Sequence, residues 1–296
     1  MTTPAADGLV VVDKPGGMTS HDVVARVRRL AATRRVGHAG TLDPMATGVL
    51  VVGIGRATRL LGFLSGQDKE YDATIRLGVT TTTDDAEGEV TTTRDASEVD
   101  DAVLAAAVGD LTGAIDQVPS AVSAVKVGGV RSYKRVRDGE TVELAPRPVT
   151  VARFEILARR GDDVDVHVTC STGTYVRALA RDVGVALGVG AHLIALRRTR
   201  VGAFGLDRAR SLDQLASHLE LTPLTDVVAM TFPRWDASYD DARRIALGQR
   251  LAPVGLPTGP VGVFGPDGAV VALVEERDDA VRPTVVFADG STTPSE

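Results

Sequence analysis

The stretch GHAGTLDPMATGVL, Gly37–Leu50, contains a histidine, an Asp–Pro step and three glycines, and it leads into the apolar run Val49–Val52. Because proline restricts the residue before it, Asp43 is biased towards an extended or turn conformation. The glycines allow tight turns or the close approach of another segment. A rigid turn beside a strand is a common mounting for a catalytic carboxylate. An Asx turn in an ordinary surface loop fits the same residues, so the stretch alone leaves both interpretations open.

The composition indicates a globular protein with one large domain, or a large and a small one. The chain has 296 residues, of which 44% are hydrophobic and 4% aromatic. It contains no run of eighteen apolar residues, and its first residues, MTTPAADG, lack the basic and apolar regions of a secretion signal. Cys170 is the single cysteine, which excludes a disulfide framework within the chain and a thiolate metal cluster. We therefore expect a cytoplasmic protein that does not enter a membrane.

The charges are distributed in alternating blocks, although the net charge is −6. Residues 1–70 carry 9 Lys and Arg against 6 Asp and Glu, and residues 111–210 carry 16 against 10. Residues 71–110 carry 2 against 10, and residues 211–296 carry 6 against 13. Two basic blocks that converge on one face would bind phosphate groups despite the acidic total. Equally, the basic and acidic blocks could mix on the surface of the folded chain and leave no basic face.

Hydrophobic periodicity predicts alternating strands and helices before residue 230. The expected strands lie at 8–13, 49–52, 69–77, 149–159, 163–169 and 192–200, and the expected helices at 21–32, 57–64, 98–108, 175–187 and 212–219. Thr19 or Ser20 is the natural N-cap of the first helix. The acidic segment 80–95 is typical of an exposed hairpin or loop. In the fourth helix, Arg177 in the first turn and Arg181 one turn later point to the same side.

The region 116–147 is basic and rich in glycine, and it contains Lys126, Arg131 and Tyr133. This composition fits a segment that grips nucleic acid, and equally a surface loop with a short helix at 132–138. A boundary falls near 230–233. Beyond it, a helix at 240–248 and short strands at 261–263, 270–275 and 284–287 predict a small β-barrel-like module.

The sequence lacks the motifs of several common enzyme classes. The five histidines show no HxxxH or HxH spacing, and the P-loop and the GxSxG motif are absent. Gly53-Ile54-Gly55 follows a strand, but Thr58 replaces the third glycine of a dinucleotide-binding motif. We therefore expect neither a metal nor a nicotinamide cofactor. Chemistry without a cofactor remains, in which an aspartate acts as a nucleophile and an arginine keeps it ionised.

Five blocks of the sequence, in order, resemble the conserved blocks of the bacterial tRNA pseudouridine synthase B family across residues 9–230. They are KPGGMTSHD (14–22), GHAGTLDPMATGVLVVGIGRATRL (37–60), KEYDATIRLG (69–78), CSTGTYVRALARDVG (170–184) and GAHLIALRRTRVG (190–202). The resemblance implies an α+β fold with a mixed, mainly antiparallel central sheet flanked by helices. It implies a catalytic domain over residues 1–232, with a thumb insertion at about 116–147. Residues 233–296 would form a short, β-rich PUA-like module.

The resemblance also implies roles for individual residues. Asp43 matches the catalytic aspartate that attacks the target uridine, and Arg177 matches the arginine that pairs with it. Tyr71 matches the aromatic ring that stacks on the flipped base and is suited to proton transfer. Leu196 matches an apolar wall of the pocket. His38 matches the histidine that occupies the space that the uridine vacates.

The remaining residues implied by the resemblance contact the substrate or support the site. Tyr175 is expected to pack beneath Arg177, and Lys126 and Arg131 in the thumb are expected to contact RNA. Lys14 and Pro15 match a motif that packs beneath the site. Gly40 and Pro44 would define the geometry of the loop that carries Asp43.

The implied reaction converts uridine 55 in the T loop of tRNA to pseudouridine without a cofactor or metal. The base must leave its stack before it reacts, and recognition would depend mainly on RNA shape. We expect the protein to act as a monomer on the T arm. The acidic C-terminal part departs from an RNA-binding module, so phosphate contacts are expected from residues 1–70 and 111–210. The alternative function is a tRNA-folding helper whose catalysis is incidental.

Overall fold

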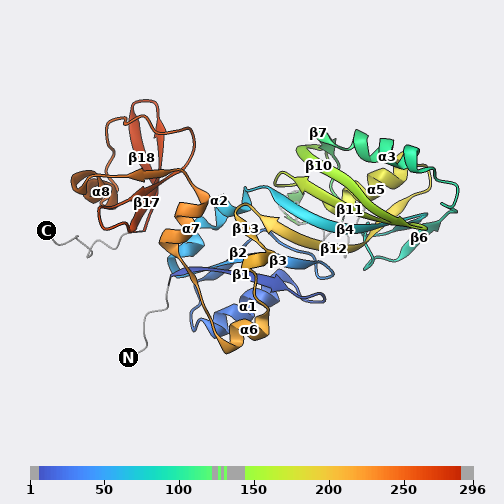
Figure 1. Cartoon of the computed structure of the whole chain (residues 1–296), viewed down its shortest axis with the longest axis horizontal. Coiled ribbons are helices and arrows are strands. Elements are labelled where there is room, and N and C mark those ends of the chain that lie inside the picture. Colours follow the sequence, from blue (N-terminus) through green and yellow to red (C-terminus); the bar gives the residue numbers. More distant parts are fainter. Residues whose placement is uncertain (1–6, 122–125, 128–129, 132–143, 288–296) are drawn as a thin grey trace.

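The computed structural model describes residues 7–121, 126–127, 130–131 and 144–287. Of 126–127 and 130–131 it describes the backbone only, as the short strands β8 (Lys126–Val127) and β9 (Val130–Arg131), which pair antiparallel. The helix expected at 132–138 and the side chains of Lys126 and Arg131 lie outside the described residues. Figure 1 shows a long, sheet-based body with a smaller module at one end.

One large sheet dominates the described residues. Its main path runs β14 (Thr222–Pro223), β1 (Gly8–Lys14), β3 (Thr47–Ile54), β12 (Ala191–Val201), β4 (Lys69–Leu77), β11 (Asp163–Cys170), β10 (Arg147–Arg160) and β7 (Gly113–Gln117). β2 (Val36–Ala39) also pairs with β3, and β13 (Phe204–Gly205) with β12. Within this sheet only β3 and β12 run parallel, at Arg197↔Thr47 and Arg198↔Gly48. The predicted mixed, mainly antiparallel sheet is therefore confirmed.

β1 and β3 read as continuous apolar runs because both of their faces are buried. Val10, Val12 and Leu50 belong to a core covered by α1 (Ser20–Leu30) and α6 (Leu212–Ser217). Leu9 and Val49, on the opposite face, belong to a second core, in which the 3₁₀ helix η1 (Gly55–Leu60), α2 (Leu61–Ser65) and α7 (Leu224–Thr231) take part. The segment that contains Asp43 therefore runs into a strand, β3, that is buried on both of its faces.

β4 and β11 alternate because only one of their faces is covered. Tyr71, Ala73, Ile75 and Leu77 face the first core, which α5 (Val176–Ala186) and α3 (Asp101–Asp110) help to enclose. The intervening residues are exposed or half-buried and form cross-strand polar pairs. This arrangement places Tyr71 on the same side of the sheet as the first turn of α5.

Thr19 rather than Ser20 caps α1. The Asp22 amide donates to Thr19 Oγ1 at 3.1 Å, and the Thr19 amide donates to the Asp22 carboxylate at 2.9 Å, which is a complete capping box. Ser20 is instead buried and directed at the loop that carries Asp43. The two candidate caps therefore have separate tasks.

The acidic segment 80–95 folds as the predicted hairpin, with strands β5 (Val79–Thr81) and β6 (Val90–Thr93). It is not exposed throughout, because Asp85 at its turn has an exposed fraction of only 3%. The expectation of an exposed segment is therefore wrong at this residue. Asp85 is buried because the turn folds back over β12, where the Leu193 amide donates to the Asp84 carbonyl.

The C-terminal module consists of α8 (Tyr239–Ala246) and a four-stranded sheet. The sheet runs β15 (Arg234–Asp236), β16 (Val261–Phe264), β17 (Val270–Arg277) and β18 (Ala280–Val286). Its described strands do not close into the expected barrel.

The short elements β13, β14, β15 and α7, and a 3₁₀ helix η2 (Leu206–Arg208), were not predicted, because tertiary pairing rather than local periodicity defines them.

The module is packed firmly onto the large sheet. Phe264, Leu273 and Phe287 join the second core, together with residues of β1 and α7. Arg56 and Arg59 donate to the backbone carbonyls of Phe287 and Val286. In Figure 1 the module lies beyond α2 and α7, at the opposite end from α3 and β7. No described helix has the length and apolar character needed to cross a membrane.

Candidate active site

The loop between β2 and β3 carries Asp43 and is clamped from below. Lys14 is fully buried, and its ammonium donates to the Pro44 carbonyl at 3.1 Å and to Met18 O at 2.6 Å. The Leu42 amide donates to Ser20 Oγ at 2.9 Å, and the Ser20 hydroxyl donates to Leu42 O at 3.1 Å. Both neighbours of Asp43 in the chain are therefore held by buried polar side chains.

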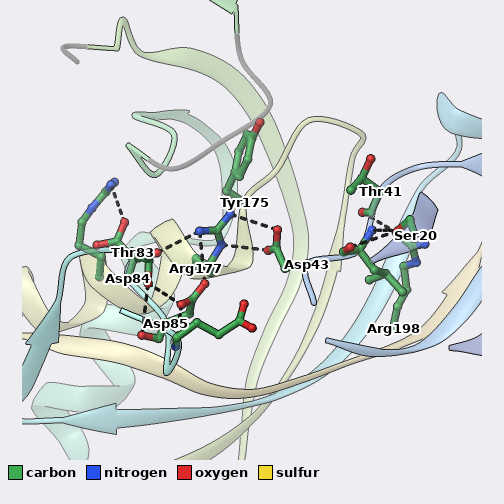
Figure 2. A network of polar contacts seen from close by, with 12 residues as sticks. Ser20, Thr41, Asp43, Thr83, Asp84, Asp85, Tyr175, Arg177 and Arg198 are labelled. Carbon is green, nitrogen blue, oxygen red and sulfur yellow. Dashed lines mark hydrogen bonds and ion pairs between the residues drawn. The ribbon is translucent and has the colours of Figure 1, made fainter. Parts of the chain in front are cut away.

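Asp43 pairs with Arg177 through two contacts. Arg177 Nε lies 3.0 Å from Asp43 Oδ2, and Nη2 donates to Oδ1 at 3.3 Å (Figure 2). The arginine side chain has an exposed fraction of 6%, whereas the aspartate retains 35%. The pair thus holds one carboxylate in a fixed direction while leaving it accessible from one side.

Arg177 has a second acidic partner that sequence reasoning missed. Its Nη1 donates to the Thr83 carbonyl at 3.0 Å and lies 3.3 Å from Asp85 Oδ2. Asp85 also accepts a hydrogen bond from the Glu87 amide at 3.0 Å. Figure 2 shows Arg177 between the two carboxylates. In the sequence Asp85 is one of several acidic residues in an acidic run, and no local signal distinguishes it from its neighbours.

The surroundings of Asp43 favour the neutral form of its carboxyl group more than water favours the neutral form of an exposed aspartate. Burial raises the pKa of Asp43, the nearby Arg177 guanidinium lowers it, and the Asp85 charge raises it again, so that the pKa lies above its usual value. The expectation that an arginine keeps the aspartate ionised therefore covers one of three main influences on this pKa. Burial also lowers the pKa of Lys14.

A cavity of about 260 Å³ opens beside the pair and unites six of the predicted residues, Gly40, Asp43, Tyr71, Tyr175, Arg177 and Leu196. Its lining also includes Lys69, Arg198 and the 172–174 turn. Tyr71 and Leu196 are buried, and burial raises the pKa of the Tyr71 phenol. Three larger grooves, of about 650, 480 and 310 Å³, contain neither Asp43 nor Arg177. The smaller cavity is the candidate site because the titratable groups converge there.

The start of α5 is held by Gln117 at the end of β7. Gln117 is buried, accepts from the Tyr175 amide at 2.8 Å and donates to the Tyr175 carbonyl at 3.1 Å. This double contact positions the first turn and therefore Arg177. The Tyr175 ring is half-buried and points away from Asp43 and Asp85 (Figure 2).

His38 lies on β2 and does not line the cavity. Its ring makes an edge-to-face contact with His21, with centroids 5.6 Å apart. Its Nδ1 is buried and has no hydrogen-bond partner in the described part of the chain. Burial and the neighbouring His21 and Arg198 lower the pKa of His38.

Two further predicted residues belong to the loop framework. Gly40 has φ +89°, a conformation that favours glycine, at the point where the chain leaves β2. Lys14 also donates to the carbonyl of Pro15 at 3.0 Å, beneath the Asp43 loop. Together with Pro44 they shape the backbone on which Asp43 stands. Among the described residues there is no group of three His, Cys, Asp or Glu side chains that could hold a metal.

The arrangement suits nucleophilic catalysis on a planar substrate. A carboxylate with a fixed direction lies in the lining of a cavity whose walls also contain an aromatic and an aliphatic side chain, Tyr71 and Leu196. The guanidinium opposes the effect of burial and so favours the ionised carboxylate, which is the nucleophilic form.

Comparisons with known proteins agree with this geometry. Residues 28–176 match the family described as "TruB family pseudouridylate synthase (N terminal domain)". Residues 177–229 match "tRNA pseudouridylate synthase B C-terminal domain", and residues 232–288 match "tRNA Pseudouridine synthase II, C terminal".

Individual relatives cover nearly the whole chain. A tRNA pseudouridine synthase B from Thermobifida fusca is 59% identical over 291 residues, covering 96% of this chain and 99% of the relative. One from Streptomyces griseus subsp. griseus is 57% identical over 296 residues, covering 97% and 98%. A solved structure of an H/ACA RNP bound to a substrate RNA containing 2′-deoxyuridine matches with a TM-score of 0.74 at 26% identity. It covers 98% of this chain and 92% of that one.

Proposed function

Since this chain belongs to the TruB family of pseudouridylate synthases, we propose that it isomerises uridine 55 in the T loop of tRNA to pseudouridine, with Asp43 as the nucleophile. Two relatives that are 59% and 57% identical over nearly the full length bear the name tRNA pseudouridine synthase B. This likeness supports tRNA as the substrate and uridine isomerisation as the reaction. The proposed reaction needs no cofactor.

The observation that carries the role of Asp43 is its ion pair with Arg177 at the mouth of the cavity. The two contacts of 3.0 and 3.3 Å hold the carboxylate, while 35% of its side chain stays exposed to an incoming base. A nucleophile needs both a fixed direction and access. No other carboxylate lines this cavity in the described part of the chain.

In the proposed reaction the Asp43 carboxylate attacks the flipped uridine, at the ribose or at the pyrimidine ring, and the bond between the ribose C1′ and the base N1 breaks. The base rotates within the cavity and forms a new bond from its C5 to C1′, and the bond to Asp43 breaks, which returns the free carboxylate. N1 gains a proton, and C5 loses one. Tyr71 stacks on the base and is suited to proton transfer, and Leu196 limits the room in which the base turns. Arg177 balances the carboxylate charge while Asp43 is free.

RNA recognition is proposed to involve parts of the chain outside the cavity. The thumb, about residues 116–147, would fold over the T loop, with Lys126 and Arg131 contacting phosphates. His38 would occupy the space that the uridine leaves. We further propose that residues 1–232 form the catalytic domain and 233–296 a PUA-like module, and that the protein acts as a monomer.

The experiment is to incubate the protein with an unmodified tRNA transcript and map pseudouridine at single-nucleotide resolution. We expect one site, at uridine 55. A transcript with cytidine at that position should give no product, which controls for modification elsewhere. Pseudouridine at another position, or its absence from the wild-type reaction, would contradict the proposal.

A further inference from the structure

Arg198, on β12, is a buried cation that the proposed reaction does not yet use. Its exposed fraction is 1%, and it is the largest fully buried side chain in the described part of the chain. No carboxylate lies within ion-pair distance of it among the described residues. Its partners are carbonyl oxygens instead. Arg198 Nε donates to Val49 O at 2.7 Å, Nη2 to Gly40 O at 3.0 Å and Nη1 to Thr41 O at 3.4 Å.

These three carbonyls lie at the two ends of the loop that carries Asp43. Gly40 and Thr41 begin the loop, just after β2, and Val49 follows it on β3. The backbone of Arg198 also approaches the loop, because β12 and β3 pair in parallel at Gly48. A Cβ on Gly48, which has φ +96°, would lie 2.2 Å from the Arg198 carbonyl. One residue therefore joins both ends of the loop to the central sheet.

Arg198 also faces Tyr71. The two residues are opposite each other in the register of β12 and β4, and both line the cavity. The Arg198 charge lowers the pKa of Tyr71 against the larger, raising effect of burial. Lys69, two residues before Tyr71, is also buried, and its pKa is lowered to about 8 by burial and by Arg198. The guanidinium thus contacts the loop of the nucleophile and borders the ring that would hold the base.

Fold stability alone is a weak explanation for such a residue. Burying a charge without an ionic partner is costly, and apolar replacements of buried ionic groups are often neutral or stabilising. Five fixed donors on a planar group, however, can bind several carbonyls at once. The geometry therefore favours a role in defining the shape of the loop.

We propose that Arg198 is a positioning residue for the reaction, because it ties the two ends of the Asp43 loop together and so directs the carboxylate into the cavity. The proposal rests on the proposed function, since it assigns Arg198 a role in the same reaction. It distinguishes Arg198 from its neighbour Arg197. Arg197 points to the other face of the sheet, pairs with Asp13 at 2.8 Å and is 40% exposed.

The test compares Arg198→Lys and Arg198→Met with the matched control Arg197→Met. For each variant we would measure the single-turnover rate of pseudouridine formation at saturating enzyme, the Kd for tRNA and the melting temperature. A displacement of about 1 Å can cost about a hundred-fold in rate. We therefore expect a loss of about a hundred-fold for Arg198→Met and about ten-fold for Arg198→Lys, since an ammonium carries its donors on one atom and cannot reach the separate carbonyls that Nε, Nη1 and Nη2 of the arginine reach.

The Kd for tRNA should stay within about three-fold in both Arg198 variants, because the side chain is not accessible to RNA. Arg197→Met should keep the wild-type rate within about two-fold. Wild-type rates in both Arg198 variants would overturn the proposal, as would a loss that appears only in Kd. If Arg198→Met does not fold, the folded Arg198→Lys variant decides by the same criteria. A wild-type protein without product would contradict the proposed function instead.

Discussion

Two arginine–carboxylate pairs in this protein have similar geometry and opposite electrostatic character. Arg177 and Asp43 meet at 3.0 and 3.3 Å beside the cavity, and Arg76 and Asp163 meet at 2.7 and 2.8 Å on the open face of the sheet. The pKa of Asp163 is lowered, chiefly by its hydrogen bonds with Arg76. The pKa of Asp43 is raised, chiefly by burial.

The difference comes from what surrounds each pair. The two carboxylates have comparable exposed fractions, 35% and 26%, but Arg177 is 6% exposed and Arg76 is 46% exposed. Arg177 also shares its charge with Asp85, which raises the pKa of Asp43 further. Ion-pair geometry therefore does not determine what a pair does. The exposed pair of Arg76 with Asp163 adds little to stability. The buried pair of Arg177 with Asp43 instead holds a carboxylate whose ionised form is less favoured than that of an ordinary aspartate.

Among the changes to the residues around Asp43, the largest effect should follow from removing the buried arginine. Arg177→Met leaves Asp43 and Asp85 without their shared cation, and breaking a buried pair costs about 3–5 kcal/mol. If a large part of this cost appears in the transition state, the single-turnover rate should fall at least about a hundred-fold. Arg76→Met is the matched control and should stay within about two-fold. Equal losses in the two variants would remove the distinction between the pairs.

A smaller effect is expected from Asp85→Asn. The amide can still accept a hydrogen bond from Arg177 but no longer repels the Asp43 charge, so the pKa of Asp43 should fall. Because the nucleophile must be ionised, the acid limb of the pH profile of kcat/KM should move to lower pH, with a loss of about ten-fold in the maximum. Asp84→Asn, which alters the neighbouring pair with Arg181, should leave the limb in place. A shift to higher pH would contradict this assignment.

The smallest effects concern stability, and their signs should differ. The pKa of Asp43 is raised in the folded protein. The titration of Asp43 therefore adds to the free energy of unfolding at pH values below the pKa of the unfolded chain, and this addition is lost as pH rises through the pKa of the folded protein. Asp43→Asn should therefore raise the melting temperature at pH 7, by about 1–2 °C. The pKa of Asp163 is lowered in the folded protein. Its titration therefore adds to the free energy of unfolding at pH values above the pKa of the unfolded chain, and this addition is lost as pH falls through the pKa of the folded protein.

Asp163→Asn should accordingly lower the melting temperature at pH 7 by about 1 °C, and the decrease should vanish in acid. Thermal scans of both variants between neutral and acidic pH check the two signs. If both substitutions shift the melting temperature in the same direction at pH 7, the contrast between the two carboxylates is wrong.

The elements that frame the site were predictable because their periodicity is local. The apolar runs of β1 and β3 and the alternation of β4 and β11 follow from which faces are covered. The first turn of α5 was expected at Arg177, and the helix begins at Val176. The ion pair of Arg177 with Asp43 joins residues that are far apart in the sequence, so it followed from the family resemblance rather than from periodicity.

Asp85 and Arg198 could not be identified from the sequence. Asp85 stands in an acidic run, and its burial arises because a hairpin folds back over β12. Arg198 belongs to the basic end of a predicted strand, and only the pairing of β12 with β3 brings it next to the Asp43 loop. Both contacts are tertiary and leave no local pattern. The same reason applies to α7 and β13–β15.

The measurement that tests the central claim most directly is the single-turnover rate of Asp43→Asn on unmodified tRNA, with the Kd measured alongside. The exchange keeps the size of the side chain and removes its nucleophilic charge. We predict a rate at least about 10⁴-fold below that of the wild type, with the Kd for tRNA within about three-fold. Pseudouridine formation at more than about a hundredth of the wild-type rate would show that Asp43 is not the nucleophile.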